Sequence, residues 1–403
     1  MKSLLVFGLA TSLATNISTA GAEEQQTDMA STASTIARQH MLIDTHIDVP
    51  DRIREGWEDV TGATADGDFD YPRAREGGLN VPFMSIYTSA ESEAEGTSYQ
   101  LANQLIDGVE ALVGRAPEKF AVVKTSSDAE KAMQNGFIGL AMGMENGSPL
   151  DHKLENVAFF KNRGISYITL THSLSNQISD SSYDENRQWN GLSPFGKEVV
   201  AEMNRQGIMV DISHVSDEAF YQVLDLSAAP VIASHSSARR FTPGFERNMS
   251  DEMIKALADK GGVIQINFGS SFLTESARNW YEQMDEARDA YFAQNEMEEL
   301  ADPSAFREKF RAEHPFPYAT LEDITANFQH VIELVGVEHV GIGSDFDGVG
   351  DSLPVGMKDV SAYPNLIEAL LKLEYSVEDI AKIMGGNLMR VWRATEAYAR
   401  GAP

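Results

Sequence analysis

The 403-residue sequence contains no cysteine. Disulfide bonds and thiolate metal sites are therefore excluded, and any metal ion must be held by His, Asp, Glu or other oxygen ligands. Basic residues are scarce as well, because 32 Lys and Arg face 61 Asp and Glu, which gives a formal net charge of −29. Nucleic acids and anionic membrane surfaces both require a basic face, so neither is an expected partner.

A long hydrophobic run is also lacking. The apolar stretch 4–14 is too short to cross a bilayer, but it follows Lys2 and precedes the small residues Ala20-Gly21-Ala22, a pattern typical of a cleavable secretory signal. A buried N-terminal helix is the alternative. We expect a signal peptide at residues 1–22, a polar flexible segment at 23–35, and an exported mature chain without a transmembrane segment, periplasmic or secreted.

The remaining residues read as one domain. No internal repeat and no linker rich in Pro, Gly or Ser interrupts them, and 42% apolar residues suffice for a full core. We therefore expect a single domain over residues 36–400. Within it, residues 51–78 are charged and contain several glycines, which predicts a long irregular loop.

Short apolar runs alternate with helical patterns along this domain. The helical patterns fall at 99–112, 154–162, 195–206, 218–224, 253–259 and 324–335. The eight apolar runs are 41–43, 81–87, 137–142, 166–170, 208–212, 231–233, 263–266 and 340–343. This alternation is the sequence pattern of an α/β fold of the (β/α)₈ TIM-barrel type, with a doubly wound sheet as the alternative.

The alternation is interrupted at about residues 270–318. This segment is rich in Glu, Arg, Met and aromatic residues and ends in Pro315-Phe316-Pro317. It predicts a helical insertion on a late βα loop. Such loops lie on the catalytic face of a barrel, so the insertion could serve as a lid or a subunit contact; a solvated surface excursion is the other interpretation.

Residues able to bind metal follow several of the predicted strands. His46 and Asp48 are two apart, so they point to the same side of a strand and can hold one ion. Barrel enzymes carry reactive groups at the carboxyl ends of strands. The candidates at such ends are His46, Asp48, Glu145, His214, His235 and Asp345. Each alone could be a helix cap or a core histidine, but together they predict one polar rim.

Imidazole and carboxylate ligands of this kind suit two Zn²⁺ ions that share a bridging carboxylate and leave a position for water. Glu145 is the natural bridge. Two cations about 4 Å apart lower the pKa of a shared water toward neutrality and supply hydroxide. The same ligands also accept Mn²⁺ or Co²⁺. The ligand types therefore indicate hydrolytic chemistry.

Several motifs resemble those of the membrane dipeptidase (renal dipeptidase) family of the metallo-dependent hydrolase superfamily. The resemblance covers about residues 41–390. The motifs are Asp44-Thr45-His46-Ile47-Asp48-Val49-Pro50, Met144-Glu145-Asn146-Gly147, Leu170-Thr171-His172, Gly191-Leu192-Ser193-Pro194-Phe195-Gly196, Asp211-Ile212-Ser213-His214-Val215-Ser216, Ser234-His235-Ser236-Ser237-Ala238, Arg247-Asn248 and Gly343-Ser344-Asp345-Phe346-Asp347-Gly348. The chain departs from the family where Leu174 replaces an expected cysteine and around 280–311, which bears on substrate choice more than on catalysis.

The resemblance implies a role for each candidate residue. His46 and Asp48 would bind one zinc ion, His214 and His235 the other, and Glu145 together with a water or hydroxide would bridge them.

The same resemblance implies the roles of three further residues. Asp345 would take the proton of the attacking water and return it to the leaving amine, and His172 would polarise the scissile carbonyl. Arg247 would pair with the substrate's terminal carboxylate, with Arg239 and Arg240 as rivals.

We therefore expect an exported dizinc dipeptidase that acts on small dipeptide substrates and tolerates a C-terminal D-residue; a homodimer is left open. One alternative is another metal-dependent amidohydrolase acting on an N-acyl amino acid, lactone or phosphoester. The other is a noncatalytic binding protein with a structural metal site.

Overall fold

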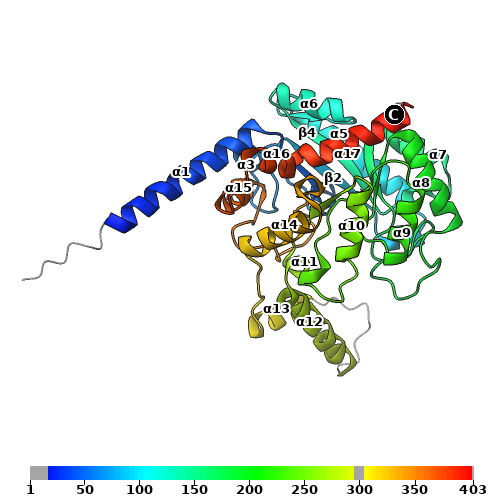
Figure 1. Cartoon of the computed structure of the whole chain (residues 1–403). Helices are drawn as coiled ribbons and strands as arrows, with labels where there is room; N and C mark the ends of the chain where they lie inside the picture. The colour runs from blue at the N-terminus through cyan, green and yellow to red at the C-terminus, as the bar shows by residue number, and fades with distance from the viewer. Residues whose placement is uncertain (1–16, 295–303, 402–403) are drawn as a thin grey trace, which may run out of the picture.

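A ring of eight parallel strands forms the centre of the computed structural model, which describes residues 17–294 and 304–401 (Figure 1). The strands run in the order β1 (Ile43–Ile47), β2 (Val81–Tyr87), β4 (Ile138–Glu145), β5 (Ile165–Thr169), β6 (Met209–Asp211), β7 (Ile232–Ala233), β8 (Val263–Ile266) and β9 (Val340–Ile342). The ring closes where Ile47 bridges to Phe346 and the Asp48 amide donates to the Phe346 carbonyl at 2.9 Å. The predicted (β/α)₈ barrel is confirmed, and the doubly wound alternative is wrong.

A ninth strand lies outside the ring. Strand β3 (Phe120–Val122) pairs in parallel with β4 alone. Its three residues are too few to show a period-two pattern, so the sequence does not predict it.

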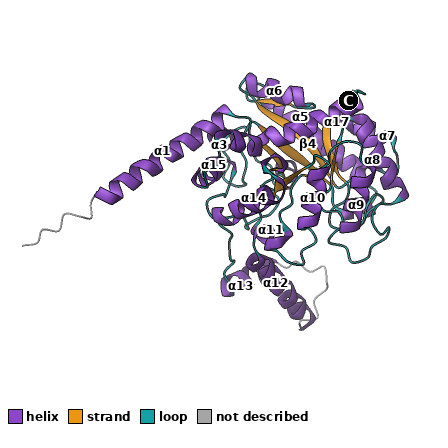
Figure 2. Cartoon of the chain, in the orientation of Figure 1, coloured by secondary structure: helices purple, strands orange, loops and turns teal. Residues whose placement is uncertain are grey.

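Helices surround the strands on their outer face (Figure 2). The principal ones are α5 (Ser98–Arg115), α7 (Glu155–Arg163), α8 (Pro194–Gln206), α9 (Asp217–Leu226), α10 (Asp251–Asp259), α14 (Leu321–Val335), α15 (Tyr363–Lys372) and α17 (Asn387–Ala399). Helix α6 (Ser126–Gln134) has the same length as α7 and α10, and α4 (Ala90–Ala94) and α16 (Val377–Ala381) are shorter.

Local signals explain where these helices begin and end. For α8, the Ser193 side chain accepts a hydrogen bond from the Gly196 amide, Pro194 occupies the first turn, and Gly207 ends the helix in the left-handed conformation.

The segment 51–78 is not an irregular loop throughout. It contributes most of α2 (Val49–Glu55) and all of α3 (Tyr71–Gly77). Both helices carry a proline in the first turn, and the Asp70 side chain caps α3 by accepting from the Arg73 amide. The glycines between the helices concealed these two starts, so the prediction is wrong for both helical parts.

The C-terminal helix closes one end of the barrel. Trp392 of α17 is fully buried among residues near the amino ends of the strands, and its ring centroid lies 5.2 Å from that of Phe83. Buried aromatic side chains of this size contribute strongly to a core. The opposite end of the barrel, at the carboxyl ends of the strands, is thereby left for the functional groups.

The N-terminal part of the described chain differs from the expected flexible segment. Residues 23–35 lie within helix α1 (Ile17–Gln39), which extends away from the barrel in Figure 1. Near its end, Ala33, Ile36 and Ala37 are buried at helical spacing, and α1 packs against α15. Most of the predicted signal peptide falls on residues 1–16, outside the described residues. Among the helices described, none combines the length and the apolar character needed to cross a membrane.

The predicted insertion lies between β8 and α14, on a late βα loop. It contains α11 (Ser270–Leu273), α12 (Glu275–Gln294) and α13 (Ser304–Glu313), and α12 and α13 project from the barrel in Figure 1. Trp280, Phe310 and Phe316 form a small separate core. The insertion is therefore helical as predicted, with residues 295–303 outside the described residues.

Candidate active site

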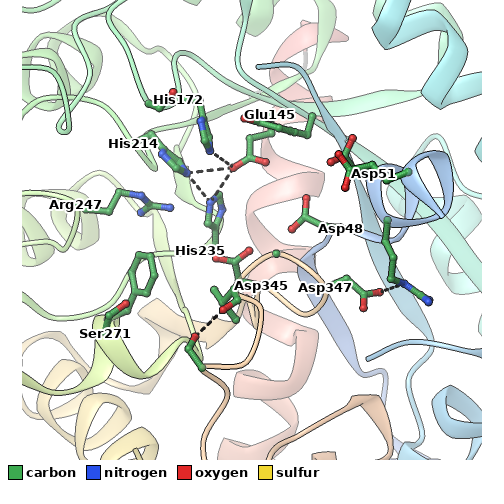
Figure 3. A pocket seen from close by; sticks show the side chains of 18 of the residues that line it. Asp48, Asp51, Glu145, His172, His214, His235, Arg247, Ser271, Asp345 and Asp347 are labelled. Carbon is green, nitrogen blue, oxygen red and sulfur yellow. Dashed lines mark hydrogen bonds and ion pairs between the residues drawn. The ribbon is translucent and has the colours of Figure 1, made fainter. Parts of the chain in front are cut away.

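The residues predicted for the functional site meet at the carboxyl ends of the barrel strands (Figure 3). Those that line one cavity of about 1140 Å³ are Asp48, Glu145, His172, His214, His235, Arg247 and Asp345. His46 lies behind them and is fully buried in β1. Strands separated by up to 300 residues of sequence thus supply one site, because the ring brings all their ends together.

Glu145, the last residue of β4, lies at the centre of this cluster. Its Oε1 atom is 3.1 Å from His214 Nε2 and 3.3 Å from His235 Nε2. Its Oε2 atom is 3.3 Å from His46 Nε2, which is also 3.4 Å from Asp48 Oδ2. The two carboxylate oxygens therefore face different ligand groups, which is the arrangement that a bridging carboxylate requires.

The donor atoms fit bound cations. Three groups each hold their possible ligand atoms within 4.8 Å of one another. They are His46, Glu145 and His235; Glu145, His172 and His214; and His46, Asp48 and Asp345. His46 Nε2 is buried without a hydrogen-bond partner, a costly arrangement that a cation would relieve by accepting its lone pair.

Hydrogen bonds determine which ring nitrogen of His46 and of His235 carries the proton and which one is left to face the cavity. His46 Nδ1 lies 2.9 Å from the Tyr167 hydroxyl, which itself donates to the Thr45 carbonyl at 2.9 Å. The hydroxyl can therefore only accept from the ring, so the proton belongs on Nδ1 and the lone pair of Nε2 faces the cavity.

His235 is held in the same way. Its Nδ1 lies 2.7 Å from Ser234 Oγ, which donates to Asp211 Oδ2 at 2.6 Å. Because this hydroxyl proton is committed to a buried carboxylate, His235 also carries its proton on Nδ1 and presents Nε2.

Backbone conformations support the site at two strand ends. His214 and Asp345 have positive φ angles of 70° and 65°, in the left-handed region that non-glycine residues seldom occupy. The His214 carbonyl accepts from the Ser182 amide at 2.8 Å, and the Asp345 amide donates to the His46 carbonyl at 3.1 Å. Neighbouring backbone thus holds both residues in a conformation that turns their side chains toward the cavity.

The local field favours positive charge at His46, beside Glu145. Burial alone would raise the pKa of Glu145, but His46 and His172 and the hydrogen bonds from the other histidines hold it well below its usual range. Burial works against charge on His46, yet Tyr167, Glu145 and Asp48 raise its pKa well above the ordinary value. A bound cation would supply that positive charge in place of the proton.

The other two histidines are neutral. Burial, followed by the charge of Arg247, lowers the pKa of His214 well below its ordinary value, and burial followed by His46 does the same for His235. Neutral imidazole is the form that binds metal.

Asp345 has an environment distinct from that of Glu145. Burial raises its pKa to about 7, with Asp48 and Glu145 adding to the rise and His46 opposing it. Its Oδ2 atom accepts a hydrogen bond from Asn267 Nδ2 at 2.7 Å. A carboxyl group poised near neutrality at the cavity wall is suited to proton transfer.

Arg247 presents unused hydrogen-bond donors to the cavity. The residue is 3% exposed, its Nη1 donates to Ser236 Oγ at 2.7 Å, and its Nε and Nη2 are buried without partners. By contrast Arg239 is paired with Asp217 at 2.6 Å, and neither it nor Arg240 is among the cavity-lining residues. Of the three arginines, Arg247 is the one positioned to bind an anionic group in this cavity.

His172 borders the same cavity beside Glu145. Its Nε2 atom is 3.6 Å from Glu145 Oε1, and its Nδ1 atom is buried without a partner. Burial lowers the pKa of His172, so its ring is neutral and can donate one hydrogen bond.

The residues of the site that were not predicted include Asn267, Tyr167 and Gly143. Asn267 follows β8 directly, so the strand-end rule that selected the other residues could have found it. Tyr167 lies within β5 and looks like a core residue in sequence. Gly143 makes room for it, because a Cβ at that position would lie 1.9 Å from Tyr167 Cζ.

Comparisons with known proteins agree with this geometry. The sequence model of the membrane dipeptidase family, peptidase family M19, matches residues 30–403. An uncharacterized dipeptidase of Schizosaccharomyces pombe is 32% identical over 384 residues, which are 90% of this chain and 82% of the relative. A dipeptidase of Aspergillus oryzae is 30% identical over 341 residues, 83% of this chain and 71% of the relative.

Solved structures share the fold. The probable dipeptidase PvdM from Pseudomonas aeruginosa has a TM-score of 0.79 at 25% identity, and the match covers 92% of this chain and 99% of that one. A metallopeptidase from Rhodobacter sphaeroides, liganded with a phosphinate mimic of the dipeptide L-Ala-D-Ala, has a TM-score of 0.72 at 23% identity over 88% of this chain and 99% of that one.

Proposed function

The chain belongs to the membrane dipeptidase family of metallopeptidases, and from this premise we propose that it is a dizinc dipeptidase that cleaves the peptide bond of free dipeptides. One observation carries the proposal: the two oxygens of Glu145 face separate histidines in a cavity that also holds the unpaired donors of Arg247. The first feature suits a pair of cations, and the second suits a substrate with a free carboxylate.

The proposed ligands divide into two groups. His46 and Asp48 would hold one zinc ion, His214 and His235 the other, and Glu145 would bridge them. Cations bound there would lower the pKa of a water molecule toward neutrality and polarise the scissile carbonyl.

Asp345 is the proposed general base and acid. Asn267 engages its Oδ2 atom, which leaves Oδ1 to receive the proton of the attacking water. Once protonated, the same carboxyl can return that proton to the leaving amine. The rise in its pKa caused by burial supports this role, because both protonation states are then accessible near neutral pH.

Two residues are proposed to orient the substrate. Arg247 would pair with the terminal carboxylate through its free Nε and Nη2, as the planar guanidinium group allows two parallel hydrogen bonds. His172 would donate to the carbonyl oxygen as negative charge develops on it.

Two further features belong to the proposal. Tolerance for a D-residue on the C-terminal side is one of them. The bound mimic in the Rhodobacter sphaeroides neighbour suggests L-Ala-D-Ala as a substrate to test. The secretory pattern of residues 1–22 supports export to the periplasm or medium.

The test is hydrolysis of L-Ala-L-Ala and L-Ala-D-Ala by purified protein loaded with zinc, with amino acid release measured before and after chelation. We expect release from both that ceases on chelation and returns with zinc. Cleavage that survives complete metal removal would refute the proposal. Equal turnover of dipeptides whose C-terminal carboxylate is an amide would instead favour another amidohydrolase reaction, because Arg247 would then have no partner.

A further inference from the structure

One wall of the cavity carries an unusual number of carboxylates. Helix α2 and the loop after it contribute four of them, which we call the acidic wall: Asp51, Glu55, Glu58 and Asp66. In Figure 3, Asp51 lies on one side of the Glu145 and histidine cluster and Arg247 on the other.

The nearby cations do not neutralise the acidic wall. Arg52 uses all of its guanidinium nitrogens, on Asp347 at 3.0 Å, Glu58 at 2.9 Å and the Phe69 carbonyl at 2.8 Å. Arg54 lies 2.7 Å from Asp51 and 3.6 Å from Glu55, so one guanidinium group serves two carboxylates, and it does not line the cavity. Four carboxylates minus two guanidinium groups leave a charge of −2 on this wall, before the partly charged Asp347 is counted.

The position of Arg247 is an independent observation, and it indicates how a substrate would be oriented in the cavity. Arg247 is buried at the opposite side with two unpartnered donor atoms, which point to an anionic ligand group. If the C-terminal carboxylate lies there, the scissile carbonyl lies at the cluster around Glu145. The N-terminal residue of the substrate would then extend toward the side of the cavity where Asp51 lies (Figure 3).

We propose that the acidic wall is a subsite for a cationic side chain on the N-terminal residue of the substrate. The substrate class is then dipeptides that begin with lysine, arginine or a similar amine-bearing residue. Trp57 also lines the cavity, but Arg115 already lies over its ring at 5.9 Å from the centroid, so the subsite rests on the carboxylates alone. This inference rests on the proposed dipeptidase function and specifies its substrate.

The test compares three dipeptides with the zinc-loaded protein: lysyl-alanine, norleucyl-alanine and glutamyl-alanine. The norleucine side chain is close to that of lysine in length but carries no charge. The ratio of kcat/KM for lysyl-alanine to that for norleucyl-alanine therefore measures the effect of the charge. We expect kcat/KM for lysyl-alanine to exceed that for norleucyl-alanine at least about tenfold and glutamyl-alanine to be the poorest. The preference should shrink as salt is raised, because these carboxylates are partly exposed.

Variants locate the preference on this wall. Asp51→Asn and Glu55→Gln should each lower the ratio of lysyl-alanine to norleucyl-alanine several-fold, and the double variant should lower it further. Glu55 is 70% exposed in its side chain, so its replacement endangers folding little. Asp225→Asn on α9 is the matched control, since that exposed carboxylate lies outside the cavity and should leave the ratio unchanged.

The outcomes separate the two proposals. Hydrolysis of all three dipeptides at equal rates would overturn the cationic subsite and leave the dipeptidase function standing. A preference for lysine that persists in the double variant would also overturn it. Absence of any hydrolysis in the zinc-loaded protein would overturn the proposed function together with the inference.

Discussion

At the scale of single residues, the site depends on which nitrogen of each histidine faces the cavity. The Tyr167 and Ser234 hydroxyl groups each donate their proton to another acceptor. Each hydroxyl can therefore only accept a hydrogen bond from the neighbouring histidine ring. His46 and His235 are thereby held in the tautomer that leaves Nε2 free. Hydrogen-bond partners of this kind fix the tautomer and the ring orientation of histidines that bind metal.

The hydrogen bond between His46 Nδ1 and the Tyr167 hydroxyl predicts what removal of that hydroxyl will do. Tyr167→Phe removes the acceptor for the Nδ1 proton of His46, so the ring loses its fixed orientation. We expect zinc affinity to fall about 10- to 100-fold, measured by competition with a chromophoric chelator. Tyr221→Phe, an exposed tyrosine on α9, is the control. Unchanged affinity in Tyr167→Phe would show that the hydroxyl does not position His46.

A second residue-scale prediction separates proton transfer from metal binding. Asp345→Asn keeps the size of the side chain but cannot accept the proton of water. We expect kcat for L-Ala-L-Ala to fall about 10²- to 10⁴-fold while the zinc content stays at the wild-type level. The measurement is steady-state kinetics together with elemental analysis of the same sample. Wild-type kcat in the variant would exclude Asp345 as the base.

Most of the site residues at or just beyond the carboxyl ends of strands could be predicted from the sequence, whereas Tyr167, in the middle of β5, could not. His46, Glu145, His214, His235 and Asp345 were predicted because the rim of a parallel barrel gathers strand ends. Tyr167 was missed, because an aromatic residue inside a strand has the same pattern whether its hydroxyl holds a histidine or only a carbonyl. That distinction depends on contacts between β1 and β5, which no local pattern encodes.

At the scale of elements, close packing between strands positions the ligands. Gly143 of β4 lies against Tyr167 of β5, where a Cβ would come within 1.9 Å of the ring. Tyr167 can hold His46 of β1 only because β4 offers that space. The glycine is needed here for its missing side chain and not for an unusual backbone angle.

This packing predicts opposite effects for two Gly→Ala replacements. Gly143→Ala should displace Tyr167, lower the free energy of unfolding by about 1–3 kcal/mol and weaken zinc binding. Gly108→Ala in α5 meets no atom within 4 Å and should leave stability unchanged or raise it by about 0.5–1 kcal/mol. Urea unfolding of both metal-free variants gives the comparison. A stable Gly143→Ala variant with normal zinc affinity would contradict the packing argument.

Elements were predictable where periodic patterns were long. The patterns at 195–206 and 324–335 correspond to α8 and α14, both of which begin at capped residues. Helices α2 and α3 have seven residues each and lie among glycines and charges, and β3 has three. Their stability comes from packing against the barrel, which the local sequence does not state.

At the scale of the whole molecule, the closed ring concentrates charge at one end. The cavity gathers carboxylates from the residue after β1, from α2 and the loop after it, from the end of β4 and from the segment after β9. The chain has a formal charge of −29, and under the proposed function the carboxylates of this cavity would attract cations while Arg247 would hold the anionic group of the substrate. The composition gives the net charge, but the fold is needed to show that several of the carboxylates gather in this cavity.

The buried carboxyl group of Asp345 makes a pH-dependent contribution to the free energy of unfolding of the metal-free protein. Burial raises the pKa of Asp345 to about 7, whereas an unfolded aspartate titrates near 3.9. Between these values the folded chain holds a proton that the unfolded chain has released. The contribution of Asp345 to the free energy of unfolding is therefore lost as pH rises from about 4 to about 7.

Asp345→Asn removes this dependence. We expect the metal-free variant to gain stability relative to the metal-free wild type as pH is raised from 5 to 7.5, measured by urea unfolding at each pH. A constant difference between the two proteins across this range would show that Asp345 does not retain a proton in the folded state.

The proposed function depends on two cations that share Glu145 at the barrel mouth. Their positions can be measured in a crystal structure of the zinc-loaded protein, with anomalous data collected on both sides of the zinc edge. We expect two anomalous peaks flanking the Glu145 carboxylate, one beside His46 and Asp48 and the other beside His214 and His235. A single peak, or peaks away from Glu145 at full zinc loading, would contradict the proposal.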